Sequence, residues 1–115
     1  MIGDLTLDTI HAGLRGLDAR RRVAEDAVAN VETPGYRARS VDFEGALSRA
    51  IESGSPLDTG PEVSFTSDPV ALPTGNNVQL DQELVGLTET GLRQQLLVEA
   101  ANAKFRLLRS VITGQ

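Results

Sequence analysis

The sequence predicts a mainly α-helical chain, in which two long terminal helices pack as an antiparallel, coiled-coil-like pair joined by a middle rich in proline and glycine. Three observations predict this fold. Apolar residues recur every three or four positions at both ends of the 115-residue chain. All five prolines lie between Glu32 and Gln79. One tyrosine, three phenylalanines and no tryptophan leave few large side chains for a compact core. We expect three segments, 1–31, 32–79 and 80–115.

The first segment has the pattern of an amphipathic helix from about Asp4 to about Val31. We expect Asp4 to cap its start. Pro34 and Gly35 mark its end, because proline cannot continue a helix and a Pro-Gly turn requires a positive φ at the glycine. The predicted buried stripe consists of Leu7, Ile10, Leu14, Leu17, Ala24, Val28 and Val31.

The middle segment is expected to hold little regular structure. It is rich in Ser, Thr, Gly and Asp, and no Lys or Arg occurs from Ala50 through Leu92. Residues 41–51 are predicted to form a short helix. Residues 62–66 alternate between polar and apolar side chains, which predicts one short strand. The remainder, including residues 53–61, is expected to be loop.

The last segment predicts a second long helix with two apolar stripes. Asn77 is expected to cap its start, and Gly114 to end it. One stripe consists of Leu80, Leu84, Leu87, Gly91, Gln94, Val98, Ala101, Phe105, Leu108 and Ile112, and the other of Leu92, Leu96, Ala100, Ala103, Leu107 and Val111. A single partner helix covers only one stripe, so we expect other chains to cover the second.

The helices are expected to assemble through their apolar stripes. The predicted assembly interface comprises Leu7, Ile10, Leu14, Leu17, Val28, Val31, Leu84, Leu87, Leu92, Leu96, Val98, Phe105, Leu107, Leu108, Val111 and Ile112. Four glycines lie inside the predicted helices, at Gly13, Gly16, Gly86 and Gly91. Each costs up to about 1 kcal/mol relative to alanine but lets a neighbouring helix approach closely. Both effects suit helices that become ordered on assembly.

Composition and charge argue against several functions. A net charge of −5 argues against nucleic-acid binding, which needs a basic face. No apolar run is long enough to span a membrane, so we expect no direct membrane insertion. Asp4 and Asp8 occupy the place of the basic and apolar parts of a secretory signal. With no cysteine and His11 as the one histidine, we expect no enzyme, no metal site and no cofactor.

One basic cluster, Arg20-Arg21-Arg22, has two interpretations. These arginines either pair with Glu25 and Asp26 at a spacing of four along the helix or meet an acidic partner surface. The sequence leaves the choice open.

Two segments resemble bacterial flagellar rod and hook proteins. The first runs from Ala29 to Phe43 and contains the turn motif Asn30, Thr33, Pro34, Gly35 and Tyr36. The second begins with Gly75-Asn76-Asn77-Val78 and Leu80-Asp81 and closes with Lys104 to Ile112. Where the family usually carries an Asn pair, this chain has Asp26-Ala27. The order and spacing of the two segments match the family over about two-thirds of the chain.

The resemblance implies a structural subunit of the flagellar basal-body rod that crosses the periplasm. It implies export by the flagellar type III apparatus without a cleaved signal and ordering of the terminal helices on assembly. The implied partners are other rod subunits, the ring and adaptor proteins at the base, and the export gate. A Phe followed four residues later by an apolar residue resembles the family's gate-recognition motif, which Phe43 and Leu47 match. The same pair could instead make a local core contact.

The turn motif carries one further expectation. Tyr36 should lay its ring on the helical layer, while its hydroxyl reaches a polar partner.

A different class of protein also fits the residues, namely a soluble helical-hairpin adaptor or chaperone that binds partner helices. An adaptor must be folded alone, whereas a rod subunit need not be. Circular dichroism of the dilute chain separates the two, because an adaptor should be strongly helical and melt sharply.

Overall fold

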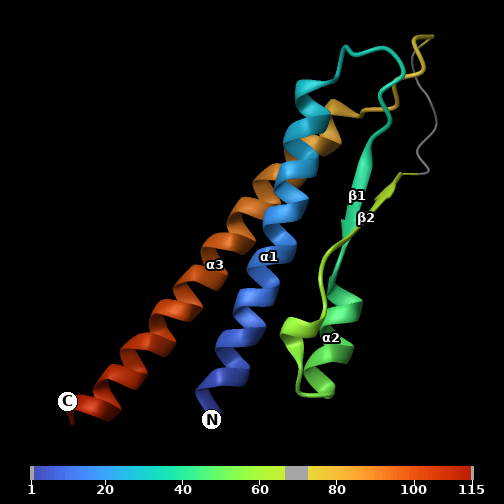
Figure 1. Cartoon of the computed structure of the whole chain (residues 1–115). Coiled ribbons are helices and arrows are strands. Elements are labelled where there is room, and N and C mark those ends of the chain that lie inside the picture. The colour runs from blue at the N-terminus through green and yellow to red at the C-terminus, as the bar shows by residue number, and fades with distance from the viewer. Residues whose placement is uncertain (1, 67–72, 115) are drawn as a thin grey trace.

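The computed structural model describes residues 2–66 and 73–114. In chain order the elements are α1 (Ile2–Ala29), β1 (Arg39–Asp42), α2 (Glu44–Glu52), a short 3₁₀ turn η1 (Pro56–Asp58), β2 (Glu62–Phe65) and α3 (Leu80–Thr113). The two long helices run antiparallel and lie side by side, and the middle elements line another side of α1 (Figure 1). The predicted mainly helical fold with paired terminal helices is confirmed.

Helix α1 begins earlier and ends earlier than the sequence predicts. Its start at Ile2 puts Asp4 inside the helix, so the expected N-cap is wrong. It ends at Ala29 because the chain tightens there. The backbone N–H of Asn30 is shared between the carbonyls of Asp26 and Ala27, both at 3.1 Å. Such tightened bonds satisfy carbonyls that the last helical turn leaves without partners.

The middle segment forms a two-stranded antiparallel sheet, of which the sequence predicts one strand. Strand β2 is confirmed at Glu62–Phe65. The short helix predicted at 41–51 is partly wrong, because Val41 and Asp42 belong to β1 and the helix begins at Glu44. Val41 pairs with Val63 in the sheet and lies buried, 6% exposed. That pairing joins residues far apart in sequence, which local alternation does not reveal.

Helix α3 begins after an extended residue and ends at a left-handed glycine. Gln79 occupies the N-cap position with no side-chain cap bond, so the expected cap at Asn77 is wrong. At the other end Gly114 has a φ of 75°, and its N–H donates to the Ser110 carbonyl at 2.9 Å. This end is confirmed, and its geometry is the one that glycine adopts without strain.

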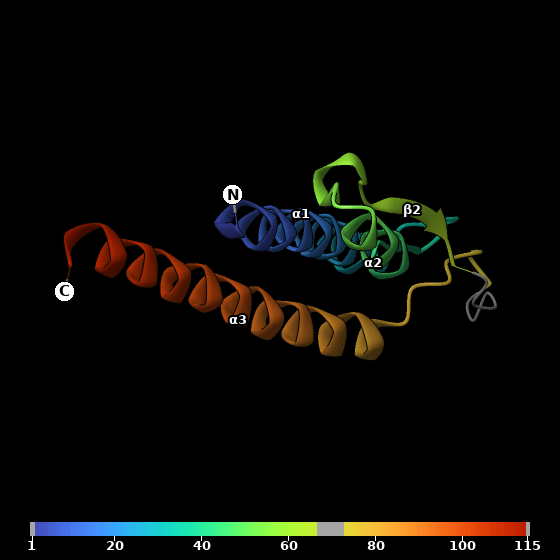
Figure 2. The same cartoon turned by 90° about the horizontal axis from the view of Figure 1, so that it is seen from below.

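The interior consists of two small clusters rather than one continuous core. One contains Leu17, Val23, Val41 and Phe43, with Leu47 and Leu97 packed against it. The other contains Ala27, Ala38 and Val78, with Val31 and Tyr36 against it. Both lie on α1, which therefore holds the molecule together. Seen from below, α3 lies along one side of α1, and none of the other described elements covers its outer side (Figure 2).

Among the described helices, none is long and apolar enough to cross a membrane.

Candidate assembly interface

The turn motif after α1 is fastened by the side chain of Asn76, which is 1% exposed. Its amide nitrogen donates to the carbonyls of Asn30 at 2.9 Å, Val31 at 3.1 Å and Thr33 at 2.8 Å. Its amide oxygen accepts from the Val78 N–H at 2.8 Å. One side chain therefore satisfies carbonyls of the turn and a donor of the segment that enters α3, which ties the two ends of the long helices together.

Asn77 makes a second connection beside it. Its side chain is fully buried, and its amide oxygen accepts from the Ala38 N–H at 2.6 Å. Its backbone N–H donates to the Tyr36 carbonyl at 3.3 Å. The two adjacent asparagines thus join residues 30–38 to the start of α3. The two segments that carry the family resemblance meet at this point of the structure.

The predicted turn geometry is present at Gly35, while part of the expectation for Tyr36 is wrong. Gly35 has a φ of +76°, and its N–H donates to the Thr74 carbonyl at 2.8 Å. The Tyr36 ring packs on the cluster of Ala27, Ala38 and Val78. Its buried hydroxyl has no hydrogen-bond partner among the described residues. The expected polar partner is therefore absent from this part of the chain.

The ring of Phe43 lies against the backbone of α1 at Gly16. A Cβ added to Gly16 would lie 2.3 to 2.5 Å from three ring carbons, so no larger residue fits without displacing the ring. Phe43 is 7% exposed, and Leu47 packs beside it in the same cluster. The two residues of the predicted gate motif thus form a core contact in the folded chain.

Arg20, one turn after Gly16 on α1, contacts the same ring. Its guanidinium lies 4.8 Å from the ring centroid of Phe43, a cation–π distance. It also donates to the Val41 carbonyl at 2.8 Å and to Glu44 at 2.6 Å. Burial acts to raise the pKa of Glu44, but the hydrogen bond and charge of Arg20 act to lower it, and the net pKa lies below its ordinary value.

The rest of the basic cluster pairs along α1. Arg21 binds Asp18 and Glu25, and Arg22 binds Asp18. The hydrogen bond from Arg21 lowers the pKa of Asp18. The expected pairing with Glu25 is confirmed. Pairing with Asp26 is wrong, because Asp26 instead binds Arg39 of β1 at 2.9 Å and joins helix to sheet.

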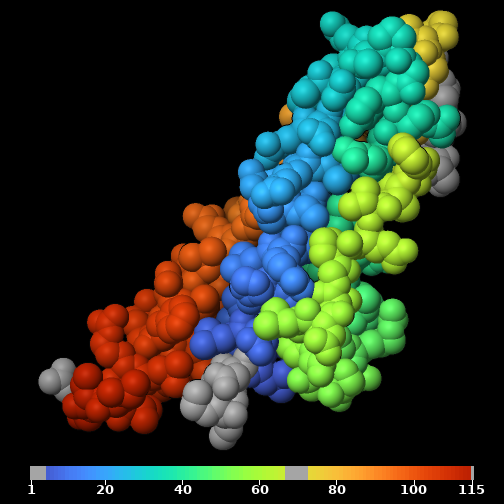
Figure 3. All heavy atoms as spheres, in the orientation of Figure 1, coloured from blue at the N-terminus to red at the C-terminus, as the bar shows by residue number. Residues whose placement is uncertain are grey.

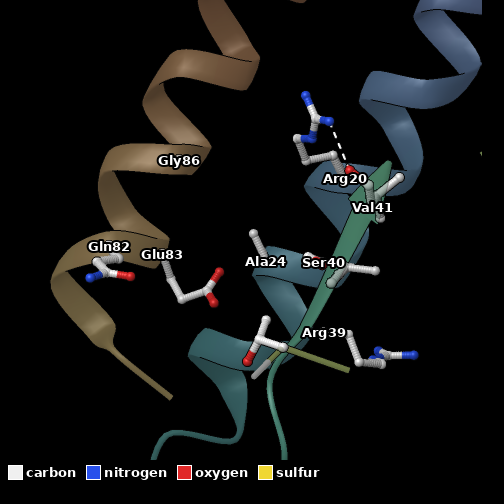
Figure 4. Close-up of a pocket in the computed structure, with 10 residues that line it drawn as sticks. Arg20, Ala24, Arg39, Ser40, Val41, Gln82, Glu83 and Gly86 are labelled. Atoms are coloured by element: carbon white, nitrogen blue, oxygen red, sulfur yellow. Dashed lines mark hydrogen bonds between the residues drawn. The ribbon is translucent and has the colours of Figure 1, made fainter. Parts of the chain in front are cut away.

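The face of α3 that meets α1 mixes leucines with small and polar residues. Thr90 is 3% exposed, and Leu87, Gln94 and Leu108 are half-buried. Near the turn, Gln82, Glu83 and Gly86 of α3 line a pocket of about 240 Å³ with residues of α1 and β1, and the Glu83 side chain points toward α1 (Figure 4). The contact between the two helices therefore uses only part of the apolar surface of α3.

Most of the large apolar side chains of α3 are exposed. The exposed ones are Leu80, Leu84, Val85, Leu92, Leu96, Val98, Phe105, Leu107, Val111 and Ile112, between 39% and 82% exposed. Both predicted stripes contribute to this set. In the space-filling view the middle segment covers one flank of α1, whereas α3 flanks it from the other side (Figure 3). Large apolar side chains exposed in this number along one helix mark an interaction surface.

The structure divides the predicted interface residues between the two helices. Those on α1 pack within the chain: Ile10 and Leu17 are buried and Leu7, Leu14 and Val28 are half-buried, as is Val31 just after the helix. Those on α3 are exposed, except the half-buried Leu87 and Leu108. The described chain thus leaves apolar side chains of both predicted stripes of α3 exposed.

The helix glycines differ in what they allow. At Gly13 an added Cβ would lie 3.0 Å from Leu97 of α3, so this glycine permits the expected close approach of the helices. Gly16 instead accommodates an aromatic ring from the middle segment. At Gly86 and Gly91 an added Cβ would meet nothing within 4 Å, so the close approach expected there is absent from the described chain.

Sequence reasoning missed the two asparagines and Gly16 as key positions. A buried Asn cannot be told from a surface Asn by pattern, and Asn76 and Asn77 follow a glycine in a loop-like segment. The adjacent pair after Gly75, which has a φ of +85°, is the signal that could have found them.

Among residues 2–66 and 73–114, no group of three or more His, Cys, Asp or Glu could hold a metal ion. The chain has a small core, a turn after α1 that is hydrogen-bonded to Asn76, and many exposed apolar side chains along α3. These features define a helical structural protein built to assemble with other chains.

Comparison with known proteins identifies the family of structural proteins to which the chain belongs. No family model matches the chain. The flagellar basal body rod protein FlgB of Bacillus subtilis (strain 168) is 30% identical over 121 residues, covering 95% of this chain and 94% of the relative. FlgB of Escherichia coli (strain K12) is 26% identical over 133 residues, covering 92% and 96%, and that of Borrelia hermsii is 27% identical over 132 residues, covering 96% and 98%. The chain belongs to the FlgB family of flagellar basal body rod proteins, a structural family.

Proposed function

We propose that the chain is a subunit at the base of the periplasmic flagellar rod, built into it through the outer face of α3. The observation that carries this proposal is the exposed apolar stripe of α3, in which Leu92 and Leu96 are 63% and 66% exposed and Val111 is 74% exposed. A chain acting alone would gain stability by burying these side chains, at about 25 cal/mol per Å² of apolar surface. Packing against neighbouring helices removes the same surface from water.

The proposed partners are other rod subunits and the ring and adaptor proteins at the base of the rod. Segments 1–31 and 80–115 supply the rod-core helices, and residues 32–79 join them. The glycines at 86 and 91 weaken α3 in the free chain and make no compensating contact there. Neighbouring chains would supply the missing packing, so the terminal helices become fully ordered on assembly.

Export precedes assembly in this proposal. The chain leaves the cytoplasm through the flagellar type III apparatus without a cleaved signal, and the export gate reads Phe43 and Leu47. Phe43→Ala and Leu47→Ala should each reduce secretion while leaving expression intact. Leu17→Ala is the matched control, because Leu17 lies in the same core cluster but outside the motif. Secretion lost equally in all three variants would instead assign the effect to the core.

Assembly is tested by genetic replacement. A strain without this chain should make no rod beyond its base and should not swim, and the wild-type chain should restore both. Normal rods in the deletion strain would overturn the proposal.

Thermal unfolding of the isolated chain distinguishes a rod subunit from the alternative, a helical-hairpin adaptor. A rod subunit should show low cooperativity in thermal unfolding followed by circular dichroism, because much of its apolar surface is uncovered. A sharp, fully reversible transition at micromolar concentration, together with binding to a partner helix in solution, would favour an adaptor.

A further inference from the structure

The contact between Phe43 and Gly16 hides the residues that the proposed export function needs. Phe43 is 7% exposed, and its ring occupies the space above Gly16 that any Cβ would fill. Leu47 lies one helical turn further and lines an apolar groove of about 270 Å³ with Leu96 and Leu97 of α3. Phe43 also lines this groove, but at 7% exposure it offers a partner little of its ring, whereas Leu47 is half-buried.

The segment that carries Phe43, residues 39–58, contacts α1 through β1, α2 and η1, and the ion pair between Arg39 and Asp26 joins it to α1 as well. The segment's inward-facing apolar side chains are Val41, Phe43 and Leu47, and α2 buries none of its residues. Arg20 closes the contact, with its guanidinium over the ring and hydrogen bonds to the Val41 carbonyl and to Glu44. A further bond joins Arg15 to the Thr59 carbonyl. When residues 39–58 leave α1, Leu97 of α3 loses part of its packing as well, because it lies against the same cluster.

We propose that the packing of the Phe43 ring on Gly16 masks the Phe43–Leu47 pair in the folded subunit. We call this contact the latch. A protein surface with an apolar pocket for the aromatic ring can bind the pair only when residues 39–58 have left α1. The inference rests on the proposed reading of this pair by the export gate. It adds that the export gate can bind the pair only in a subunit whose residues 39–58 are not packed on α1, because the folded subunit presents no Phe43 ring.

The consequence for binding is quantitative. When only a fraction of molecules has the latch open, the apparent affinity falls by that same fraction. Opening the latch by mutation should therefore tighten binding of the full chain to the gate without adding any contact.

Gly16→Ala opens the latch, because the new methyl group and the ring cannot share one space. The matched control is Gly86→Ala, the same change in a long helix where an added Cβ meets nothing within 4 Å. Limited digestion with chymotrypsin, which cleaves after exposed aromatic residues, reports the state of Phe43 directly. We expect cleavage after Phe43 to rise about tenfold in Gly16→Ala and to stay at the wild-type rate in Gly86→Ala.

Binding of the full-length variants to the purified cytoplasmic part of the export gate tests the function of the latch. We expect Gly16→Ala to bind about tenfold more tightly than wild type, and Gly16→Ala with Phe43→Ala to lose the gain. Arg20→Gln, which removes the guanidinium without adding bulk, should tighten binding in the same direction. This variant keeps the test valid if Gly16→Ala disturbs α1.

The outcomes separate the two claims. If Phe43→Ala weakens binding but neither latch variant changes it, the gate reads the pair and the masking is wrong. If Phe43→Ala leaves binding unchanged, the gate does not read the pair and the proposed export role fails. Equal chymotrypsin cleavage in wild type and Gly16→Ala would overturn the latch itself.

Discussion

The side-chain amide of Asn76 donates to the carbonyl of Thr33 at 2.8 Å, across 43 residues of chain. The same amide nitrogen also donates to the carbonyls of Asn30 and Val31, so one buried side chain is the donor for three carbonyls of the turn. This relationship fixes where α1 ends and where the chain returns to start α3. It sets the register of the two long helices at the turn and so defines which face of α3 remains outside.

Replacing Asn76 by Asp should destabilise the free chain by about 1–3 kcal/mol. Aspartate has nearly the same shape but cannot donate to the three carbonyls. The midpoint and slope of urea unfolding, followed by circular dichroism, measure the change. Asn102→Asp on the exposed side of α3 is the control and should change stability by less than about 0.5 kcal/mol. Equal effects at the two positions would show that the bonds of Asn76 contribute nothing.

The helices could be predicted because their signals are local. Alternation at three and four residues located α1 and α3, and Gly114 marked the end of α3 by a conformation that glycine adopts freely. Strand β2 was visible in residues 62–65 for the same reason. Strand β1 was not, since Val41 is its one buried residue and its partner lies 22 positions away along the chain, at Val63.

The candidate site was predicted less completely, and the reason is its dependence on tertiary contacts. The exposed face of α3 followed from two apolar stripes. The roles of Asn76 and Asn77 did not, because their bonds join segments that approach only after folding. Likewise, the sequence marked Gly16 as a helix glycine, but only the fold places Phe43 on it.

Gly35→Val should impair rod assembly through backbone strain alone. Gly35 has a φ of +76°, and an added Cβ would meet nothing within 4 Å. A β-branched residue disfavours that conformation, at a cost on the order of 1–2 kcal/mol. Swimming on soft agar in a strain that carries only the variant measures the effect. Gly60→Val is the control, because Gly60 is also uncrowded but is not in the left-handed region. Full motility of Gly35→Val would mean that the turn can take another form.

The ion pair between Arg20 and Glu44 should make stability depend on acid pH. The pKa of Glu44 is lower in the folded chain than its ordinary value of 4.5. Its ionised form therefore stabilises the fold above that pH, and the contribution is lost as pH falls through the folded pKa. The side chain of Glu44 is 53% exposed, so the contribution is at most about 1 kcal/mol.

Urea unfolding of wild type and Glu44→Gln from about pH 6 to about pH 3 measures this contribution. The wild type should be the more stable of the two at the upper pH, and the difference should shrink toward the lower. A difference that stays constant over the range would remove Glu44 as its source.

Leu107→Asp should abolish incorporation into the rod while sparing the free chain. Leu107 is 57% exposed, so a charge there costs little before assembly. Within a packed interface the same unpaired charge costs several kcal/mol. The variant should be expressed and secreted at wild-type levels but be missing from purified basal bodies on immunoblots. Ser64→Asp, on the exposed strand β2 and outside the predicted interface, should incorporate normally. Basal bodies that contain the Leu107→Asp chain would remove this face from the assembly interface.

The most direct test of the central claim, that the outer face of α3 is buried in the rod, is cysteine labelling before and after assembly. The chain has no cysteine, so single Cys substitutions at Leu92, Leu96 and Asn102 report one site each. We predict that maleimide labels all three rapidly in the free chain, and that purified basal bodies protect the cysteines at 92 and 96 at least about tenfold relative to the free chain. Labelling of positions 92 and 96 at the same rate in basal bodies as in the free chain would contradict the account.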